Sequence, residues 1–139
     1  MVTAELNPGN EMVLSDESPT SPCGVTFEDD GETGYFYALD LGRRSGDNQI
    51  VDALHLYDAN QVVDRDRPSM VSILWSSDGM KSCLLINRYP HAVFDFSGRR
   101  GYSRNNYPIT PSPEDTSWLT SNHEWDDAAL QGFDLSATR

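Results

Sequence analysis

The sequence predicts a mainly β protein, an antiparallel sheet or sandwich built around a three-stranded meander at residues 71–96, with one or two short C-terminal helices. Three observations support this fold class. Residues 71–96 form the longest apolar stretch of the chain, and Asp78-Gly79 at its centre is the strongest short-range hairpin signal. Elsewhere, short apolar runs alternate with clusters of turn-forming residues, which is typical of strands rather than helices.

A two-residue turn at Asp78-Gly79 fixes the register of the central hairpin. Directly opposed residues share a face, so one face carries an apolar set: Val71, Ile73, Trp75, Leu84 and Ile86. The other face carries Leu74, Cys83 and Leu85. Because both faces are apolar, we expect the hairpin to be covered on both sides by a second sheet or a helix.

The third strand of the meander is expected at residues 91–96, after a four-residue loop at 87–90. In that register Ala92, Phe94 and Phe96 continue the face of Cys83 and Leu85. The residues between them, His91, Val93 and Asp95, then continue the face of Trp75.

The segments before the meander are expected to alternate between strands and loops. Prolines, acids and serines in residues 1–22 predict a flexible acidic arm, in which 11–15 fits a short edge strand. A single globular domain is expected over 23–139. Strands at 23–27 and 35–41 form a second hairpin, and 61–63 fits a brief strand. Residues 50–57 fit either a strand or one and a half helical turns, and their flanking strands favour a strand.

Residues 97–118 after the meander are rich in glycine, asparagine and proline, which predicts a long loop. Long irregular loops within a compact domain are often functional. Ser112-Pro113-Glu114-Asp115 is a helix-start signal, and the helix it begins should end near Leu119. A second short helix is expected at 123–131, ended by Gly132.

Charge is the strongest compositional signal in the 139 residues. The net charge is −12, from 10 basic and 22 acidic residues, and residues 1–42 hold nine acids and no base. Such a field repels nucleic acid and anionic membranes and attracts basic partners. There is no apolar run of about 18 residues, which predicts no membrane span. The N-terminus lacks the features of a signal peptide, which predicts a cytoplasmic protein.

Two cysteines, Cys23 and Cys83, fit a cytoplasmic location. A disulfide between them stays open, but in a reducing compartment two small apolar residues are favoured. The cysteines lie in no zinc-ribbon or thioredoxin-type motif.

Residues 99–107 form the most distinctive polar segment. Its arginine forks and tyrosine rings suit a phosphate or a stacked base, but pairing with the protein's own acids is favoured by the net charge. His91 and Asp95, with His123, would supply a metal site, although their spacing matches no metal motif. Trp118 and Trp125 are expected to be core or docking residues. The candidate binding residues are therefore His91, Asp95, Arg99, Arg100, Tyr102, Arg104, His123 and Trp125, and no catalytic residue, metal or cofactor is predicted.

The chain also resembles a family of small uncharacterised bacterial proteins, a domain of unknown function, from about Gly34 to Asp127. The resemblance rests on a series of short sequence segments: 34–38, 52–55, 64–65, 75–79, 84–87, 91–96, 100–102 and 123–125. It implies a bacterial origin and no established activity, so it assigns no role to any residue.

Two functions from different classes follow. The first is a non-catalytic protein-binding module that uses its acidic surface against a basic protein partner, as an immunity-type protein does when it neutralises a bacterial toxin. The alternative is a small-molecule or metal-dependent enzyme with a site formed by His91, Asp95, Arg100, Tyr102 and His123. The absence of a nucleophile or phosphate-loop motif favours the first. The oligomeric state stays open.

Overall fold

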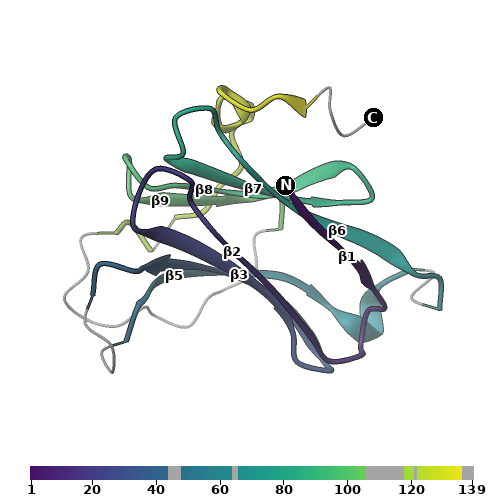
Figure 1. Cartoon of the computed structure of the whole chain (residues 1–139). Coiled ribbons are helices and arrows are strands. Elements are labelled where there is room, and N and C mark those ends of the chain that lie inside the picture. Colours follow the sequence, from purple (N-terminus) through teal and green to yellow (C-terminus); the bar gives the residue numbers. More distant parts are fainter. Residues whose placement is uncertain (44–47, 64–65, 106–117, 121, 136–139) are drawn as a thin grey trace.

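Two antiparallel sheets pack face to face in the computed structural model, which describes every residue except 44–47, 64–65, 106–117, 121 and 136–139 (Figure 1). Sheet A has the order β1-β6-β7-β8-β9, and sheet B has the order β2-β3-β4-β5. The mainly β prediction is therefore confirmed, in its sandwich form. No helix among the described residues is long and apolar enough to cross a membrane.

The elements follow one another in this order: β1 (Val2–Leu6), β2 (Met12–Glu17), β3 (Cys23–Asp29), β4 (Thr33–Asp40), β5 (Ile50–Asp58), the 3₁₀ helix η1 (Ala59–Gln61), β6 (Ser69–Trp75), β7 (Lys81–Ile86), β8 (Tyr89–Asp95), β9 (Arg100–Ser103) and the 3₁₀ helix η2 (Asp127–Leu130).

The main core lies between the two sheets. Alternate residues of the strands of both sheets point into it and are fully buried: Val25, Phe27, Phe36, Leu54, Val71, Ile73, Leu84 and Phe94. The rings of Phe36 in sheet B and Phe94 in sheet A stack with centroids 5.0 Å apart. Trp118 packs edge-on against Phe96, at 5.3 Å, so it is a core residue as expected.

The central hairpin has the predicted register. Val71 pairs with Ile86, Ile73 with Leu84 and Trp75 with Ser82. Gly79 has a φ of 73°, and the carboxylate of Asp78 accepts hydrogen bonds from Ser76 Oγ and the Met80 N–H. Local turn chemistry therefore sets the pairing of β6 with β7.

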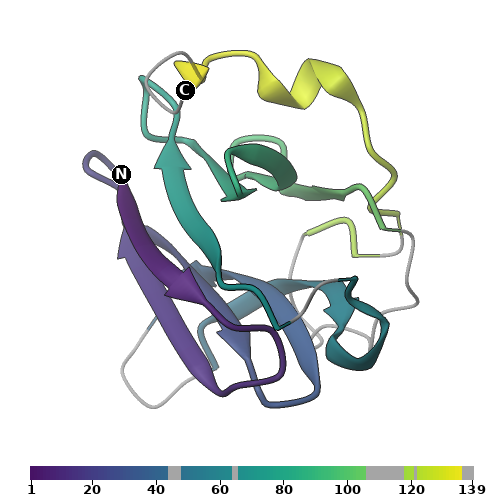
Figure 2. The same cartoon turned by 90° about the vertical axis from the view of Figure 1, so that its right-hand side faces the viewer.

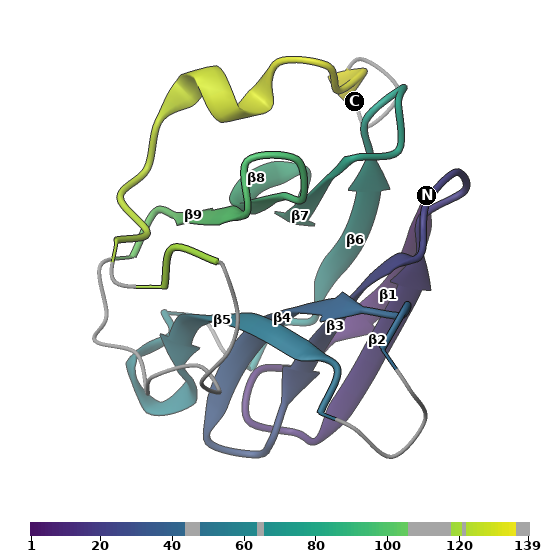
Figure 3. The same cartoon turned by 90° about the vertical axis from the view of Figure 1, so that its left-hand side faces the viewer.

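Both faces of this hairpin are covered, as expected. Its inner face joins the main core, and its outer face, with Leu74, Cys83 and Leu85, forms a second apolar cluster. The segment around η2 crosses the outer side of sheet A (Figures 2 and 3), and its residues close this cluster: Trp125, Ala129, Leu130, Phe133 and Leu135. The outer cover is thus an irregular segment with one short 3₁₀ helix.

The predicted facing of the third strand is wrong. Asn87 and Arg88 both have positive φ, at 52° and 68°, so the connection is a two-residue turn and β8 already begins at Tyr89. A bulge at His91 then shifts the register, so that Leu84 pairs with Ala92. A one-residue shift exchanges the two faces of a strand. Ala92, Phe94 and Phe96 therefore lie in the main core, and Val93 lies in the outer cluster.

The flexible arm expected at 1–22 is also wrong. β1 pairs with β6 over five positions and β2 pairs with β3 over six, so both belong to the sandwich. Pro8 and Gly9 lie in the turn between these two strands, where Gly9 has a φ of 91°. The turn formers that suggested an irregular arm are thus the connection between two strands, one in each sheet.

Of the remaining elements, some match the predictions and others do not. The hairpin at 23–27 and 35–41 is confirmed as β3 and β4, and 50–57 is the strand β5. The brief strand at 61–63 is wrong, because the 3₁₀ helix η1 ends at Gln61 and neither Val62 nor Val63 belongs to a strand. The long loop after Phe96 contains the strand β9. Most of the helix expected at 112–119 lies outside the described residues, and the helix expected at 123–131 is reduced to η2.

Candidate functional site

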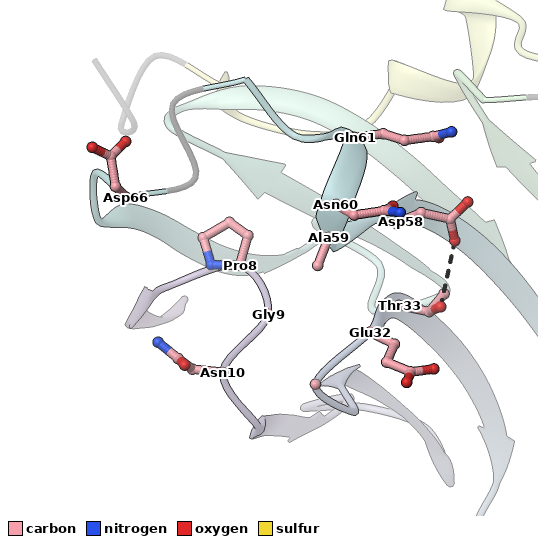
Figure 4. A pocket seen from close by; sticks show the side chains of 11 residues that line it. Pro8, Gly9, Asn10, Glu32, Thr33, Asp58, Ala59, Asn60, Gln61 and Asp66 are labelled. Carbon is pink, nitrogen blue, oxygen red and sulfur yellow. Dashed lines mark hydrogen bonds between the residues drawn. The ribbon is translucent and has the colours of Figure 1, made fainter.

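An acidic cleft lies where three connections meet at one end of the sandwich (Figure 4). The turn between β1 and β2, the turn between β3 and β4, and the region of η1 enclose about 730 Å³. Its described lining residues are Pro8, Gly9, Asn10, Gly31, Glu32, Thr33, Asp58, Ala59, Asn60, Gln61 and Asp66. The charged ones, Glu32, Asp58 and Asp66, are all carboxylates.

Asp29 holds these connections together from beneath. Its side chain is 1% exposed, and its carboxylate accepts hydrogen bonds from the N–H groups of Gly9 and Gly31, both at 2.9 Å. The hydroxyl of Tyr57 donates a third, at 2.7 Å. Three donors replace the water that a buried carboxylate loses, so Asp29 fixes the β1–β2 turn, the β3–β4 turn and the end of β5 to one another.

Tyr57 requires a glycine opposite it. A Cβ atom on Gly34 would lie 2.3 Å from the Tyr57 ring, so only glycine leaves room for the ring that reaches Asp29. Burial and the hydrogen bond to Asp29 raise the pKa of Tyr57, so this hydroxyl remains a donor at every physiological pH.

The rim of the cleft adds further negative charge. Asp30 is exposed, and the N–H groups of Thr33 and Glu32 lower the pKa of its carboxyl, which therefore stays ionised. Asp58 accepts a hydrogen bond from the Thr33 hydroxyl at 3.4 Å (Figure 4). It also contacts the imidazole of His55 at 2.9 Å. Hydrogen bonds within the fold therefore set the positions of the Asp30 and Asp58 carboxylates.

A row of aromatic side chains continues from Asp58 across the outer face of sheet B. His55 lies 5.6 Å from Tyr35, and Tyr35 stacks on Tyr37 at 5.7 Å. The Tyr37 hydroxyl donates to Glu28 Oε1 at 3.1 Å. Each of the three rings is half-buried. The cleft therefore adjoins a partly exposed aromatic surface that also bears carboxylates.

Four of the sequence-predicted binding residues meet on the outer side of sheet A. The guanidinium of Arg100 lies 4.6 Å from the Tyr102 ring, and that of Arg104 lies 4.0 Å from Trp125 and 4.5 Å from Tyr89. Arg104 Nε also donates to the Pro90 carbonyl at 2.6 Å. In the described part of the chain, these two cations contact the protein's own aromatic rings and carbonyls, and neither forms an ion pair with the acids that the sequence favoured as partners.

His123 lies on the other side of sheet A, between the sheets. It is 7% exposed, and its Nε2 lies 2.9 and 3.0 Å from the two carboxylate oxygens of Asp52, which is fully buried. A Cβ atom on Gly101 would lie 3.0 Å from Asp52 Oδ2, so this glycine makes room for the pair. The pair joins β5 of sheet B to the segment that follows β9.

The other three predicted residues do not form one site. His91 lines a small apolar pocket. Asp95 and Arg99 lie at the β8–β9 connection, where Asp95 accepts a hydrogen bond from the Gly98 N–H at 3.0 Å and Arg99 is exposed with a φ of 54°. The five residues of the enzyme hypothesis thus occupy both sides of sheet A. In the described part of the chain, no group of three or more His, Cys, Asp or Glu side chains is placed to hold a metal ion.

His91 should make stability depend on pH. Burial, and secondly the charge of Arg104, lower the pKa of its imidazole from 6.5. The unfolded chain then binds the proton more readily than the folded one, so stability falls as the pH drops below about 6.5 toward the lower folded-state pKa. Urea unfolding from about pH 7.5 to 5 should show a steeper loss for the wild type than for His91→Gln. Parallel profiles would contradict this assignment.

The acidic cleft is the part of the site that the sequence did not reveal. In the sequence, residues 28–34 only separate the strands predicted at 23–27 and 35–41, and nothing local indicates that the β1–β2 turn and η1 join them. The available sequence signals were weak: the glycines Gly9 and Gly31, which both have positive φ in the structure, and an acid, Asp29, that the structure places at the end of β3.

Similarity to known proteins extends over most of the chain. Residues 6–134 match the family described as "Uncharacterized protein conserved in bacteria (DUF2251)". An uncharacterised protein of Haemophilus influenzae is 50% identical over 84 residues, which cover 60% of this chain and 51% of that protein. The chain thus spans about half the length of the curated relative it matches. No solved structure matches it. The chain therefore belongs to this family of uncharacterised proteins conserved in bacteria.

Proposed function

We propose that the protein is a non-catalytic binding module whose acidic cleft engages a basic protein partner. The observation that carries the proposal is the uniform sign of charge in the cleft: among the described residues, each ionisable lining group is a carboxylate. With a net charge of −12 behind it, the cleft attracts cationic groups and repels nucleic acid and anionic membranes.

The character of the cleft favours a protein over a small molecule. Small-molecule sites are mostly apolar. Here, beside Pro8 and Ala59, most of the wall is polar, with amide, hydroxyl and carboxylate groups of Asn10, Asn60, Gln61, Thr33 and the three acids. Lysine and arginine side chains of a partner match such a surface. Electrostatic attraction of this kind speeds association and makes it sensitive to salt.

The adjoining aromatic row supports a macromolecular partner. Tyrosine is enriched at protein interfaces because its ring offers a large contact area with a polar tip. Tyr37 contacts Glu28, and Tyr35 reaches Asp58 through His55, so aromatic rings and negative charge lie along one series of contacts. One partner that would suit this surface is a cytoplasmic toxin with a cationic cleft. The protein would cover that cleft, as an immunity protein does.

Neutralising the cleft should abolish partner capture. The variant Glu32→Gln/Asp58→Asn/Asp66→Asn is used as bait at low salt in a lysate of the native host. The amount of basic protein that it captures should be lower than for the wild type by a factor of at least about ten. Captured proteins are identified and their isoelectric points compared. Raising the salt from about 50 to 500 mM should release them from the wild type.

A matched control separates the cleft from the overall charge. Glu5, Glu17 and Glu124 are exposed and lie outside the cleft, so replacing all three by glutamine changes the net charge equally. This control should keep its partners to within about twofold. Equal loss in both triple variants, or capture of no basic protein by the wild type, would rule out the proposed function.

A further inference from the structure

A second cavity, smaller and apolar, lies beside the acidic cleft and shares Pro8 with it. It measures about 170 Å³ and is lined by Leu6, Pro8, Leu56, Tyr57, Val62, Ser69, Ile86, His91 and Asn105. These residues come from both sheets, because Leu6, Ser69, Ile86 and His91 belong to sheet A and Leu56 and Tyr57 belong to sheet B. The cavity is therefore an opening between the two layers of the sandwich.

Most polar wall groups of this cavity already have partners. The Tyr57 hydroxyl donates to Asp29, Ser69 Oγ accepts from the amide of Asn87 at 3.2 Å, and the Asn105 side-chain amide donates to the Leu56 carbonyl. They hold the walls in place. They also leave the cavity surface mainly apolar, in contrast with the neighbouring cleft.

His91 differs from these groups. Its imidazole nitrogens make no hydrogen bond to any residue in the described ranges, and its ring is held edge-on by Tyr89 at 5.5 Å. Burial lowers the pKa of the imidazole, so it is neutral at physiological pH and one ring nitrogen can accept a hydrogen bond. The bulge in β8 places it there, because His91 is the extra residue of the shifted register.

The size of the cavity restricts the ligand. Pockets for drug-sized molecules measure about 300–1,000 Å³, whereas an apolar cavity of about 150 Å³ holds benzene. The apolar walls disfavour any charged ligand, because they offer nothing in place of its water. An anion is disfavoured further by the carboxylates of the adjoining cleft.

We propose that this pocket binds a compact, uncharged molecule, a single aromatic ring bearing one hydroxyl group, whose hydroxyl donates a hydrogen bond to the imidazole of His91. The ring would fill the space between Leu6, Leu56 and Ile86. This site is separate from the protein-binding function and does not depend on it.

Titration of the full chain with phenol tests the site, followed by two-dimensional amide NMR and by calorimetry. Saturable binding is expected, with shifts at Leu56, Ile86 and His91, whereas benzoate should bind at least about tenfold more weakly because of its charge. Val62→Trp, which fills the pocket from a loop, should abolish phenol binding. Val63→Trp is the matched control, because Val63 is 85% exposed and lies outside the pocket, so this variant should bind as the wild type does.

Toluene separates the role of the imidazole from that of the cavity. His91→Phe keeps a ring but removes the acceptor, so it should weaken phenol binding by about fivefold and leave toluene binding within about twofold. Absence of saturable phenol binding, unchanged binding in Val62→Trp, or equal losses of phenol and toluene in His91→Phe would each overturn the proposal.

Discussion

Replacing His123 by alanine should lower the free energy of unfolding by about 3–5 kcal/mol, since removing one member of a buried pair strands the other charge. Asp52 is fully buried, and besides His123 Nε2 its carboxylate contacts the neighbouring Ala53 N–H at 2.9 Å. Without the imidazole this carboxylate loses its side-chain hydrogen-bond donor inside the core. Such a loss is a large share of the roughly 5–15 kcal/mol that stabilises a typical domain.

Urea unfolding of the two histidine variants measures this effect against a matched control. His55→Ala also breaks a histidine–aspartate contact of 2.9 Å, but the side chains there are 20% and 34% exposed, so a loss of at most about 1 kcal/mol is expected. If His123→Ala costs no more than His55→Ala, the Asp52–His123 pair does not hold β5 to the segment after β9 as described.

The Asp52–His123 pair also shows why part of the architecture escaped prediction. His123 was a candidate binding residue, whereas Asp52 was not among the candidates. Their partnership spans 71 residues and depends on the segment after β9 returning between the sheets. No periodicity or turn signal in either segment carries that information.

Where local turn chemistry determines strand pairing, the sequence was sufficient to predict the structure. Asp78-Gly79 determines a turn, the turn determines the pairing of Val71 with Ile86, and two apolar faces require two covers. The prediction for the third strand was wrong for an equally local reason. Asn87-Arg88 forms a two-residue turn without glycine and is followed by a bulge, and neither feature has a strong sequence signal.

The acidic cleft was predictable only in part. The acids at 28–32 were evident in the sequence, but their role depended on whether residues 1–22 were ordered. Because β1 and β2 enter opposite sheets, their turn is brought against the β3–β4 turn, where Gly9 reaches Asp29. The interpretation of Pro8-Gly9 as part of a flexible arm therefore hid both the strands and the site.

Replacing Asp29 by alanine should cost about 3 kcal/mol, because the Gly9 N–H, the Gly31 N–H and the Tyr57 hydroxyl would each lose their acceptor at a buried position. The neighbouring Asp30→Ala is the matched control. Asp30 also accepts two backbone hydrogen bonds, at 3.0 and 2.9 Å, but it is exposed, so water can replace it and at most about 1 kcal/mol is expected. Thermal and urea unfolding compare the two variants.

The same pair of variants links the fold to the proposed function. Asp29→Ala removes no charge that lines the cleft, yet it releases the β1–β2 and β3–β4 turns from each other and from β5. At a temperature where the variant stays folded, its capture of basic partners should fall severalfold, whereas Asp30→Ala should change capture less. If Asp29→Ala is destabilised but binds as the wild type does, the arrangement of these turns is not what the partner recognises, and the charge of Glu32, Asp58 and Asp66 alone would have to account for binding.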